Sequence, residues 1–132
     1  MVVSYQAETI DRGTLQDYDN IRLCAKDSQT MAHVFIMPNP DNGNESIRQH
    51  IEHHAAMYER HQVHEYLPHA EFLNLLAHCE EFIGNSSAML YEAPELGIKT
   101  RMIGKRQRGR TIPFGDGNAS ARMVNILKHC AL

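Results

Sequence analysis

Short apolar runs alternate with amphipathic segments along the chain, and this alternation constrains the fold more than any other feature. The run 33–37 is apolar throughout, as in strands covered on both faces. Comparable strand segments are expected at 2–5, 63–67, 81–83 and 100–103. Repeated βα units predict a parallel sheet, right-handed crossovers and helices on both faces. The predicted fold class is α/β: a single Rossmann-like three-layer domain over residues 1–132, with a parallel sheet of about five to six strands.

Helical periodicity fills the intervals between these strands. Ser46 and Gln49 have the spacing of a capping box, and Gly97 is placed to end a helix that begins at Ala88. Asn118 is expected to cap a final helix. The side chains expected on the inner face of this last helix are Met123, Val124 and Leu127.

Composition excludes several classes of function. The formal net charge of −3 argues against a general nucleic-acid binder, and no apolar run approaches the roughly 18 residues needed to cross a membrane. The N-terminal segment lacks the pattern of a secretion signal. The cysteines are odd in number and widely spaced, so no disulfide framework is expected, and they are interpreted as buried reduced thiols: Cys24, Cys79 and Cys130. Reduced thiols make a cytoplasmic location the default expectation.

Three polar, glycine-containing loops follow predicted strands, at residues 38–44, 84–87 and 104–117. Ligands of open parallel sheets bind beyond the carboxyl ends of the strands. The turn 84–87 is the sharpest candidate, because a strand, small residues and a helix start together form an anion site. Ser86 and Ser87 can add hydroxyl donors, while a purely capping role for either serine stays open.

Glu92 extends this candidate site along the same predicted helix. It follows Ser86 by six residues, or about 9 Å along a helix axis. This separation is similar to the distance between the diphosphate and the ribose diol of a nucleotide. A carboxylate at that distance could accept hydrogen bonds from both ribose hydroxyls. Taken alone, Glu92 would be interpreted as a solvated surface acid.

Several stretches in the same order resemble the UDP-N-acetylglucosamine 2-epimerases, and specifically the C-terminal half of that family. They comprise Gly84-Asn85-Ser86-Ser87, Glu92-Ala93-Pro94, residues 104–110, residues 38–43, and Leu67-Pro68 with the apolar residues that follow. The Arg-Gln-x-Gly-Arg sequence at 106–110 is most similar to the hydrolysing branch. The resemblance covers nearly the whole chain and implies one half of a two-domain, GT-B-type enzyme, with the substrate between the domains.

The resemblance also implies a ligand, a reaction and roles for individual residues. Ser86, Ser87 and Ala88 would hold the diphosphate of UDP or of a UDP-N-acetylhexosamine, and Glu92 the ribose. Arg110 would face the phosphates, beside Gln107 and Arg106. The reaction would convert UDP-N-acetylglucosamine to N-acetylmannosamine and UDP, or to UDP-N-acetylmannosamine, by eliminating UDP across C1 and C2. No cofactor, metal, membrane or nucleic-acid partner is implied.

Two departures from the family leave the catalytic residues unassigned. Gln6 and Ala7 occupy the position of a His-Pro pair, and glutamine is neither an acid nor a base near neutral pH. The family's catalytic carboxylates belong to the other domain. We therefore expect the chain to bind UDP or its sugar without turning it over alone. It would pair with a separate N-terminal-half subunit or form a homodimer, or it would be a fragment of a longer protein. The alternatives are a stand-alone UDP-sugar sensor and the nucleotide-binding subunit of a split glycosyltransferase.

Histidines and a basic run offer competing interpretations. His50, His53 and His54 share a predicted helix, but no further ligand completes a recognisable metal set, so solvated histidines are favoured. The basic run 105–110 follows a strand, and a phosphate-facing loop is favoured there over a solvated loop or a nucleic-acid patch.

Overall fold

The computed structural model of the chain describes residues 1–8, 14–110 and 118–129. Its five strands form one fully parallel sheet in the order β3-β2-β1-β4-β5. The predicted α/β class and parallel sheet are confirmed. The strands are β1 (Val2–Ser4), β2 (Val34–Ile36), β3 (Gln62–His64), β4 (Phe82–Gly84) and β5 (Thr100–Met102).

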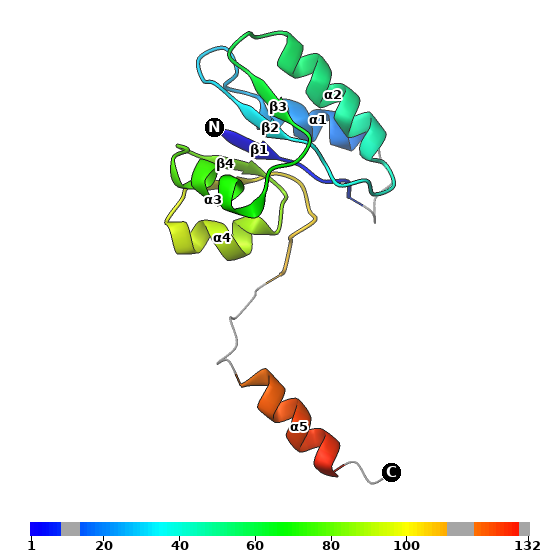
Figure 1. Cartoon of the computed structure of the whole chain (residues 1–132). Helices are drawn as coiled ribbons and strands as arrows, with labels where there is room; N and C mark the ends of the chain where they lie inside the picture. Colours follow the sequence, from blue (N-terminus) through cyan, green and yellow to red (C-terminus); the bar gives the residue numbers. More distant parts are fainter. Residues whose placement is uncertain (9–13, 111–117, 130–132) are drawn as a thin grey trace.

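Helices cover both faces of the sheet, as the alternation predicts (Figure 1). The first pair packs on one face and the second pair on the other, while a fifth helix follows the last strand. The helices are α1 (Thr14–Cys24), α2 (Asn44–Ala56), α3 (His69–Ala77), α4 (Ala88–Leu96) and α5 (Ala119–His129).

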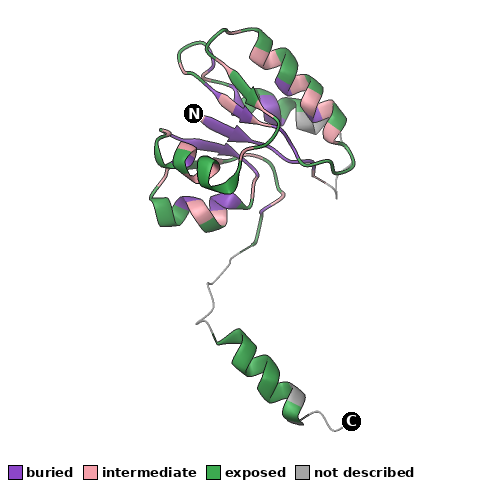
Figure 2. Ribbon diagram, viewed as in Figure 1, coloured by how far each residue is buried: buried purple, intermediate pink, exposed green. Residues whose placement is uncertain are grey.

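The core consists of two clusters, because successive side chains of a strand point to opposite faces of a sheet. On one face Val3, Phe35 and Ile83 pack beneath Ile47 and Ile51 of α2. On the other face Val2 and Phe82 pack against Leu76 of α3 and Ala93 of α4. Figure 2 shows this buried layer running through the middle of the sheet. The central strands β1 and β4 are therefore covered on both sides, which holds their carboxyl ends in place.

Two helix ends differ from the sequence prediction. Helix α2 begins at Asn44, after Gly43 in a left-handed conformation with φ 90°, and no side chain caps it. The predicted capping box at Ser46 is therefore wrong, because the glycine turn starts the helix two residues earlier. The predicted stop at Gly97 is confirmed, with φ 67° and backbone bonds from its N–H to the last helix carbonyls.

Helix α5 does not bury the face predicted to be internal. Met123 is 57% and Val124 49% exposed, and every other side chain described on α5 is exposed as well (Figure 2). An amphipathic pattern shows that a helix has an apolar face, but burial also requires a surface to cover that face. Among the described residues no such surface lies against it.

Two of the three cysteines lie within the described residues. Cys24 is fully buried, and burial raises the pKa of its thiol to about 12, although the positive charge of Arg101 opposes the effect. Cys79 is half-buried and free. The expectation of a buried free thiol is confirmed for Cys24, Cys79 is free but only partly buried, and Cys130 lies outside the described residues.

Candidate functional site

The order of the strands places a switch point between β1 and β4. From β1 the chain winds outward through β2 to β3, then crosses back and continues through β4 to β5. Crevices of open α/β sheets form at the carboxyl ends of strands where the winding direction reverses. Ser4 and Gly84 are paired at this point, so the segments that follow them emerge side by side.

A cavity of about 350 Å³ lies at these carboxyl ends. Its polar wall consists of Ser4, Gln6, Ser86, Ser87 and Arg106. The rest of the lining comes from the ends of β2 and β3 and the start of α3: Ile36, Met37, Asn39, Glu65, Tyr66, Leu67, His69 and Phe72. The cavity therefore has a hydroxyl-rich, cationic side and a more apolar side, which suits a ligand with an anionic part and a planar or apolar part.

The turn after β4 has donors available for an anion. Ser86 Oγ accepts a 3.3 Å hydrogen bond from the N–H of Ala88, so this serine caps the first turn of α4, yet its own O–H remains free to donate. The backbone N–H groups of Ser86 and Ser87 have no acceptor among the described residues. The turn thus combines backbone and hydroxyl donors with the positive end of α4.

Asn85 connects this turn to its surroundings, although its role was not recognised from the sequence. Its side chain is fully buried and pairs with the backbone of Gln6 in both directions, at 2.6 and 2.8 Å. The backbone carbonyl oxygen of Asn85 accepts hydrogen bonds from Gln107 Nε2 at 3.0 Å and from Arg106 Nη1 at 3.4 Å. The turn, the end of β1 and the basic loop are therefore joined through one residue.

Gln6 is buried and holds a neighbouring loop. Its side-chain oxygen accepts a 2.8 Å hydrogen bond from the backbone N–H of Asn39, while the residue also lines the cavity. The side-chain NH2 group of Gln6 can still donate, and its oxygen keeps a second lone pair. The Gln6 side chain therefore holds the loop at Asn39 in place, and it carries no group that titrates near neutral pH.

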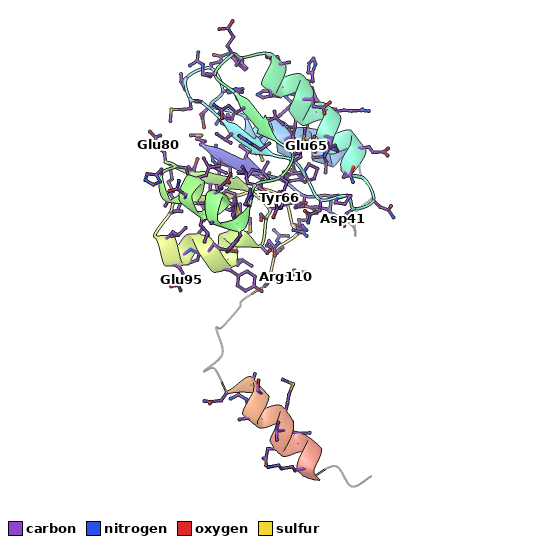
Figure 3. All side chains as sticks on the ribbon, viewed as in Figure 1. Asp41, Glu65, Tyr66, Glu80, Glu95 and Arg110 are labelled. Carbon is purple, nitrogen blue, oxygen red and sulfur yellow. The ribbon has the colours of Figure 1, made fainter. Side chains whose placement is uncertain are left out.

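The structure brings together some of the predicted ligand-binding residues and separates others. Ser86, Ser87 and Arg106 line the cavity, whereas Ala88, Glu92, Gln107 and Arg110 do not. Gln107 is only 3% exposed and donates to the backbone carbonyl of Asn85. Arg110 is exposed (Figure 3).

Glu92 lies one turn into α4 and is half-buried. Its Oε2 atom is inaccessible to solvent, and no described residue donates a hydrogen bond to it. A buried carboxylate oxygen without a partner is costly, and a ligand hydroxyl would satisfy it once the Glu92 side chain turned toward the cavity.

Residues that sequence reasoning missed lie on the opposite wall. Tyr66 is 76% exposed, and it extends together with Glu65 from the segment between β3 and α3 (Figure 3). A second cavity of about 400 Å³ adjoins the first, sharing Met37, Asn39, Glu65 and Tyr66. Arg48 of α2 lines it and pairs with Glu65 at 2.5 Å. A large aromatic side chain in a polar loop is the one sequence signal that could have indicated this wall.

The histidines form a separate cluster near the amino ends of β2 and β3. His33, His54 and His61 pack ring against ring, and burial lowers the pKa of all three, that of His33 to about 4. His50 and His53 lie on the same helix as His54, beside α1. Within the described residues, no three His, Cys, Asp or Glu side chains are arranged to hold a metal ion.

The sheet order, the glycine-containing turn and the helix that starts above the switch point define a Rossmann-like α/β domain. Residues 1–113 match the profile of the family described as UDP-N-acetylglucosamine 2-epimerase. The chain belongs to this family. Among the described helices, none has the length and apolar character required to cross a bilayer.

Two curated relatives are similar over part of their length. Polysialic acid biosynthesis protein P7 of Escherichia coli is 29% identical over 95% of this chain and 34% of its own length. A UDP-N-acetylglucosamine 2-epimerase of Neisseria meningitidis is 35% identical over 58% of this chain and 20% of its own length. The chain therefore spans about a third or less of these relatives.

Solved structures share the fold at low identity. A Neisseria meningitidis UDP-GlcNAc 2-epimerase bound to UDP-GlcNAc superposes with a TM-score of 0.60 at 16% identity, over 96% of this chain and 44% of that one. The S. aureus MnaA–UDP structure gives 0.57 at 16% identity, over 96% and 45%. Both likenesses concern one part of a longer protein.

Proposed function

We propose that this chain binds the nucleotide part of a UDP-sugar in the cavity at the carboxyl ends of β1 and β4. The observation that carries the proposal is that one cavity has two chemically different walls. Free N–H and O–H donors of Ser86 and Ser87 lie with the Arg106 guanidinium on one side, and Leu67 and Phe72 lie on the other. A diphosphate matches the first wall and a nucleoside the second.

Two further observations support the ligand class. The family and the solved relatives, which are described as bound to UDP-GlcNAc and to UDP, point to the same chemistry. Glu92 has an unpartnered oxygen on the helix that starts at the diphosphate wall, where ribose hydroxyls would satisfy it. Gln107 supports the loop that carries Arg106 through its bond to Asn85. Arg110 continues the same loop, with its backbone N–H bonded to the Gln107 carbonyl.

Isothermal titration with UDP, UDP-N-acetylglucosamine, uridine and pyrophosphate tests this function. We expect UDP and the UDP-sugar to bind more tightly than uridine or pyrophosphate, because only they reach both walls. Absence of heat for UDP up to millimolar concentration would contradict the proposal. Equal affinities for UDP and uridine would contradict the diphosphate wall in particular.

We further propose that the chain acts as the C-terminal half of a GT-B-type 2-epimerase, closest to the hydrolysing branch, in the cytoplasm. The matched relatives are two to five times longer than the part that the chain covers, which supports a missing second half. That half would be a separate subunit or another region of a longer chain. The isolated chain should release no UDP from UDP-N-acetylglucosamine, and release at a rate typical of an enzyme would contradict this assignment.

A non-catalytic UDP-sugar-binding module is the second candidate, and one observation favours it. Gln6 uses its only side-chain acceptor to hold Asn39, so the position serves architecture and supplies no proton-transfer group. Adding the N-terminal half of a related epimerase separates the two candidates. Restored turnover would favour the split enzyme, and tight UDP-sugar binding without turnover would favour the module.

A further inference from the structure

Glu8 forms an unexpected contact between two loops at the carboxyl end of the sheet. It lies four residues after the end of β1, and its Oε1 accepts a 2.6 Å hydrogen bond from the backbone N–H of Lys105. Lys105 directly precedes Arg106, the one arginine in the lining of the main cavity. A carboxylate from one loop therefore holds the residue next to the phosphate-facing guanidinium of another.

The backbone at Gly104 is shaped around the same carboxylate. Gly104 has a φ of +83°, and a Cβ built there would lie 2.0 Å from Glu8 Oε1 and 3.4 Å from Asn20 Nδ2. Asn20 is itself fixed, since it is buried and donates to the hydroxyl of Tyr5 at 2.7 Å. Only a glycine in a left-handed conformation allows the loop to approach Glu8 this closely.

The loop is also anchored on either side of Lys105. Ile103 donates to the carbonyl of Gly84 at 2.8 Å, and Gln107 donates to Asn85 at 3.0 Å. Between Ile103 and Gln107, the described residues provide two bonds to other segments, and the shorter is the bond from Lys105 to Glu8 at 2.6 Å. Arg106 lies in that interval, and its own bond to Asn85 is long at 3.4 Å.

We propose that Glu8 is a positioning residue for diphosphate binding, because it fixes the start of the 104–110 loop and so holds the Arg106 guanidinium on the cavity wall. This inference rests on the proposed function and extends it to a residue outside the cavity lining. The Glu8–Lys105 contact is exposed, so its loss costs the fold little. The main effect should fall on the phosphate-dependent part of ligand affinity.

The test compares Glu8→Ala, Glu8→Gln and the control Glu95→Ala, an exposed acid on α4 (Figure 3). For each, the ratio of UDP affinity to uridine affinity is measured by titration, and melting temperatures are recorded. Glu8→Ala should lower the ratio by about tenfold, the scale of one charge-assisted contact. Glu8→Gln keeps an acceptor and should restore at least half of the loss on a logarithmic scale. Glu95→Ala should leave the ratio unchanged.

Hydrogen exchange of the Lys105 amide gives a readout that needs no ligand. The amide should be protected in the wild type and in Glu8→Gln, and should exchange faster in Glu8→Ala. An unprotected Lys105 amide in the wild type, an unchanged affinity ratio in Glu8→Ala, or equal losses in both Glu8 variants would each overturn the proposal.

The ratio of UDP affinity to uridine affinity in the wild type shows whether the role of Glu8 or the proposed UDP-binding function is wrong. If the wild type binds UDP no better than uridine, the diphosphate site is wrong and the role of Glu8 falls with it. If the wild type prefers UDP and Glu8→Ala keeps that preference, only the role of Glu8 is wrong.

Discussion

The side chain of Asn85 pairs with the backbone of Gln6 as a neighbouring strand would, accepting from its N–H at 2.6 Å and donating to its carbonyl at 2.8 Å. The last paired positions of β1 and β4 are Ser4 and Gly84, and the pair extends this contact to Gln6, two residues past Ser4, and Asn85, one residue past Gly84. The positions of Gln6 and of the serine turn are consequently linked.

Replacing Asn85 with aspartate should break half of this pair. The carboxylate keeps an acceptor for Gln6 but places a second oxygen against the Gln6 carbonyl, in a fully buried position. We expect a loss of about 2–4 kcal/mol in the free energy of unfolding at neutral pH. Denaturant titration measures it, with Asn74→Asp on the exposed face of α3 as control. A loss below about 0.5 kcal/mol would contradict the buried pairing.

Gly84 should not tolerate any side chain. Its φ is 137°, and a Cβ there would stand 2.0 Å from the carbonyl oxygen of Ser4, which belongs to rigid backbone. Gly84→Ala should therefore cost at least roughly 4 kcal/mol in unfolding free energy or prevent folding. Gly97→Ala is the matched control: its φ is 67° but nothing lies within 4 Å, so about 1 kcal/mol is expected. Similar melting temperatures for the two variants would argue against the close strand contact.

Arg106→Ala should reduce UDP affinity by roughly 10- to 100-fold while leaving uridine affinity unchanged, because the guanidinium contributes charge-assisted bonds to phosphate only. Arg108 is the natural control, since it is exposed in the same loop and does not line the cavity. Titration calorimetry at constant ionic strength measures both. Equal losses for Arg106→Ala and Arg108→Ala would indicate a diffuse charge effect in place of a contact.

Glu92→Gln should weaken UDP and uridine by about tenfold each and leave pyrophosphate binding unaffected, since only the first two carry a ribose. The Glu92 carboxylate, whose Oε2 is buried without a partner, is expected to turn outward and accept hydrogen bonds from the ribose hydroxyls. Glu95→Gln, an exposed substitution further along α4, serves as control. The ribose assignment fails if pyrophosphate loses as much affinity as UDP.

The histidine cluster should make stability depend on pH. Burial lowers the pKa of His33 to about 4, with smaller effects from the charges of His61, the N-terminus and His54, while the Met31 carbonyl opposes the shift. Between about pH 6.5 and pH 4 the unfolded chain binds a proton there that the folded chain does not. The neutral, buried His33 therefore contributes fully to the free energy of unfolding above pH 6.5. This contribution is lost as the pH falls toward 4, because protonation favours the unfolded chain.

The expected loss is on the order of 2 kcal/mol in unfolding free energy, and the lowered pKa values of His54 and His61 act in the same direction. His33→Asn keeps a donor for the Met31 carbonyl but does not titrate, so it should flatten this slope. His53→Gln, an exposed change on α2, should not. Denaturant titrations between pH 4 and pH 7.5 measure the slope for each variant, and an unchanged slope in His33→Asn would contradict the prediction.

Much of the fold could be predicted because its signals are local. Apolar runs and helical periodicity depend on residues close in sequence, and they correctly indicated the parallel sheet and the helix end at Gly97. The serine turn was predictable for the same reason, since the strand, the small residues and the helix start are contiguous. Helix α5 shows the limit: its apolar pattern was recognised, but whether a surface covers Met123 and Val124 is not a local property.

The order of residues thus determined the α/β class, the turn at Ser86 and Ser87, and the basic loop, all of which depend on short-range patterns. Tertiary structure alone decided that Asn85 bridges Gln6 and Gln107, that Gln6 holds Asn39, and that Glu8 reaches Lys105. These contacts join positions that lie 22 to 97 residues apart. They form because parallel strands carry distant segments to a common edge, and only the strand order determines which loops meet there.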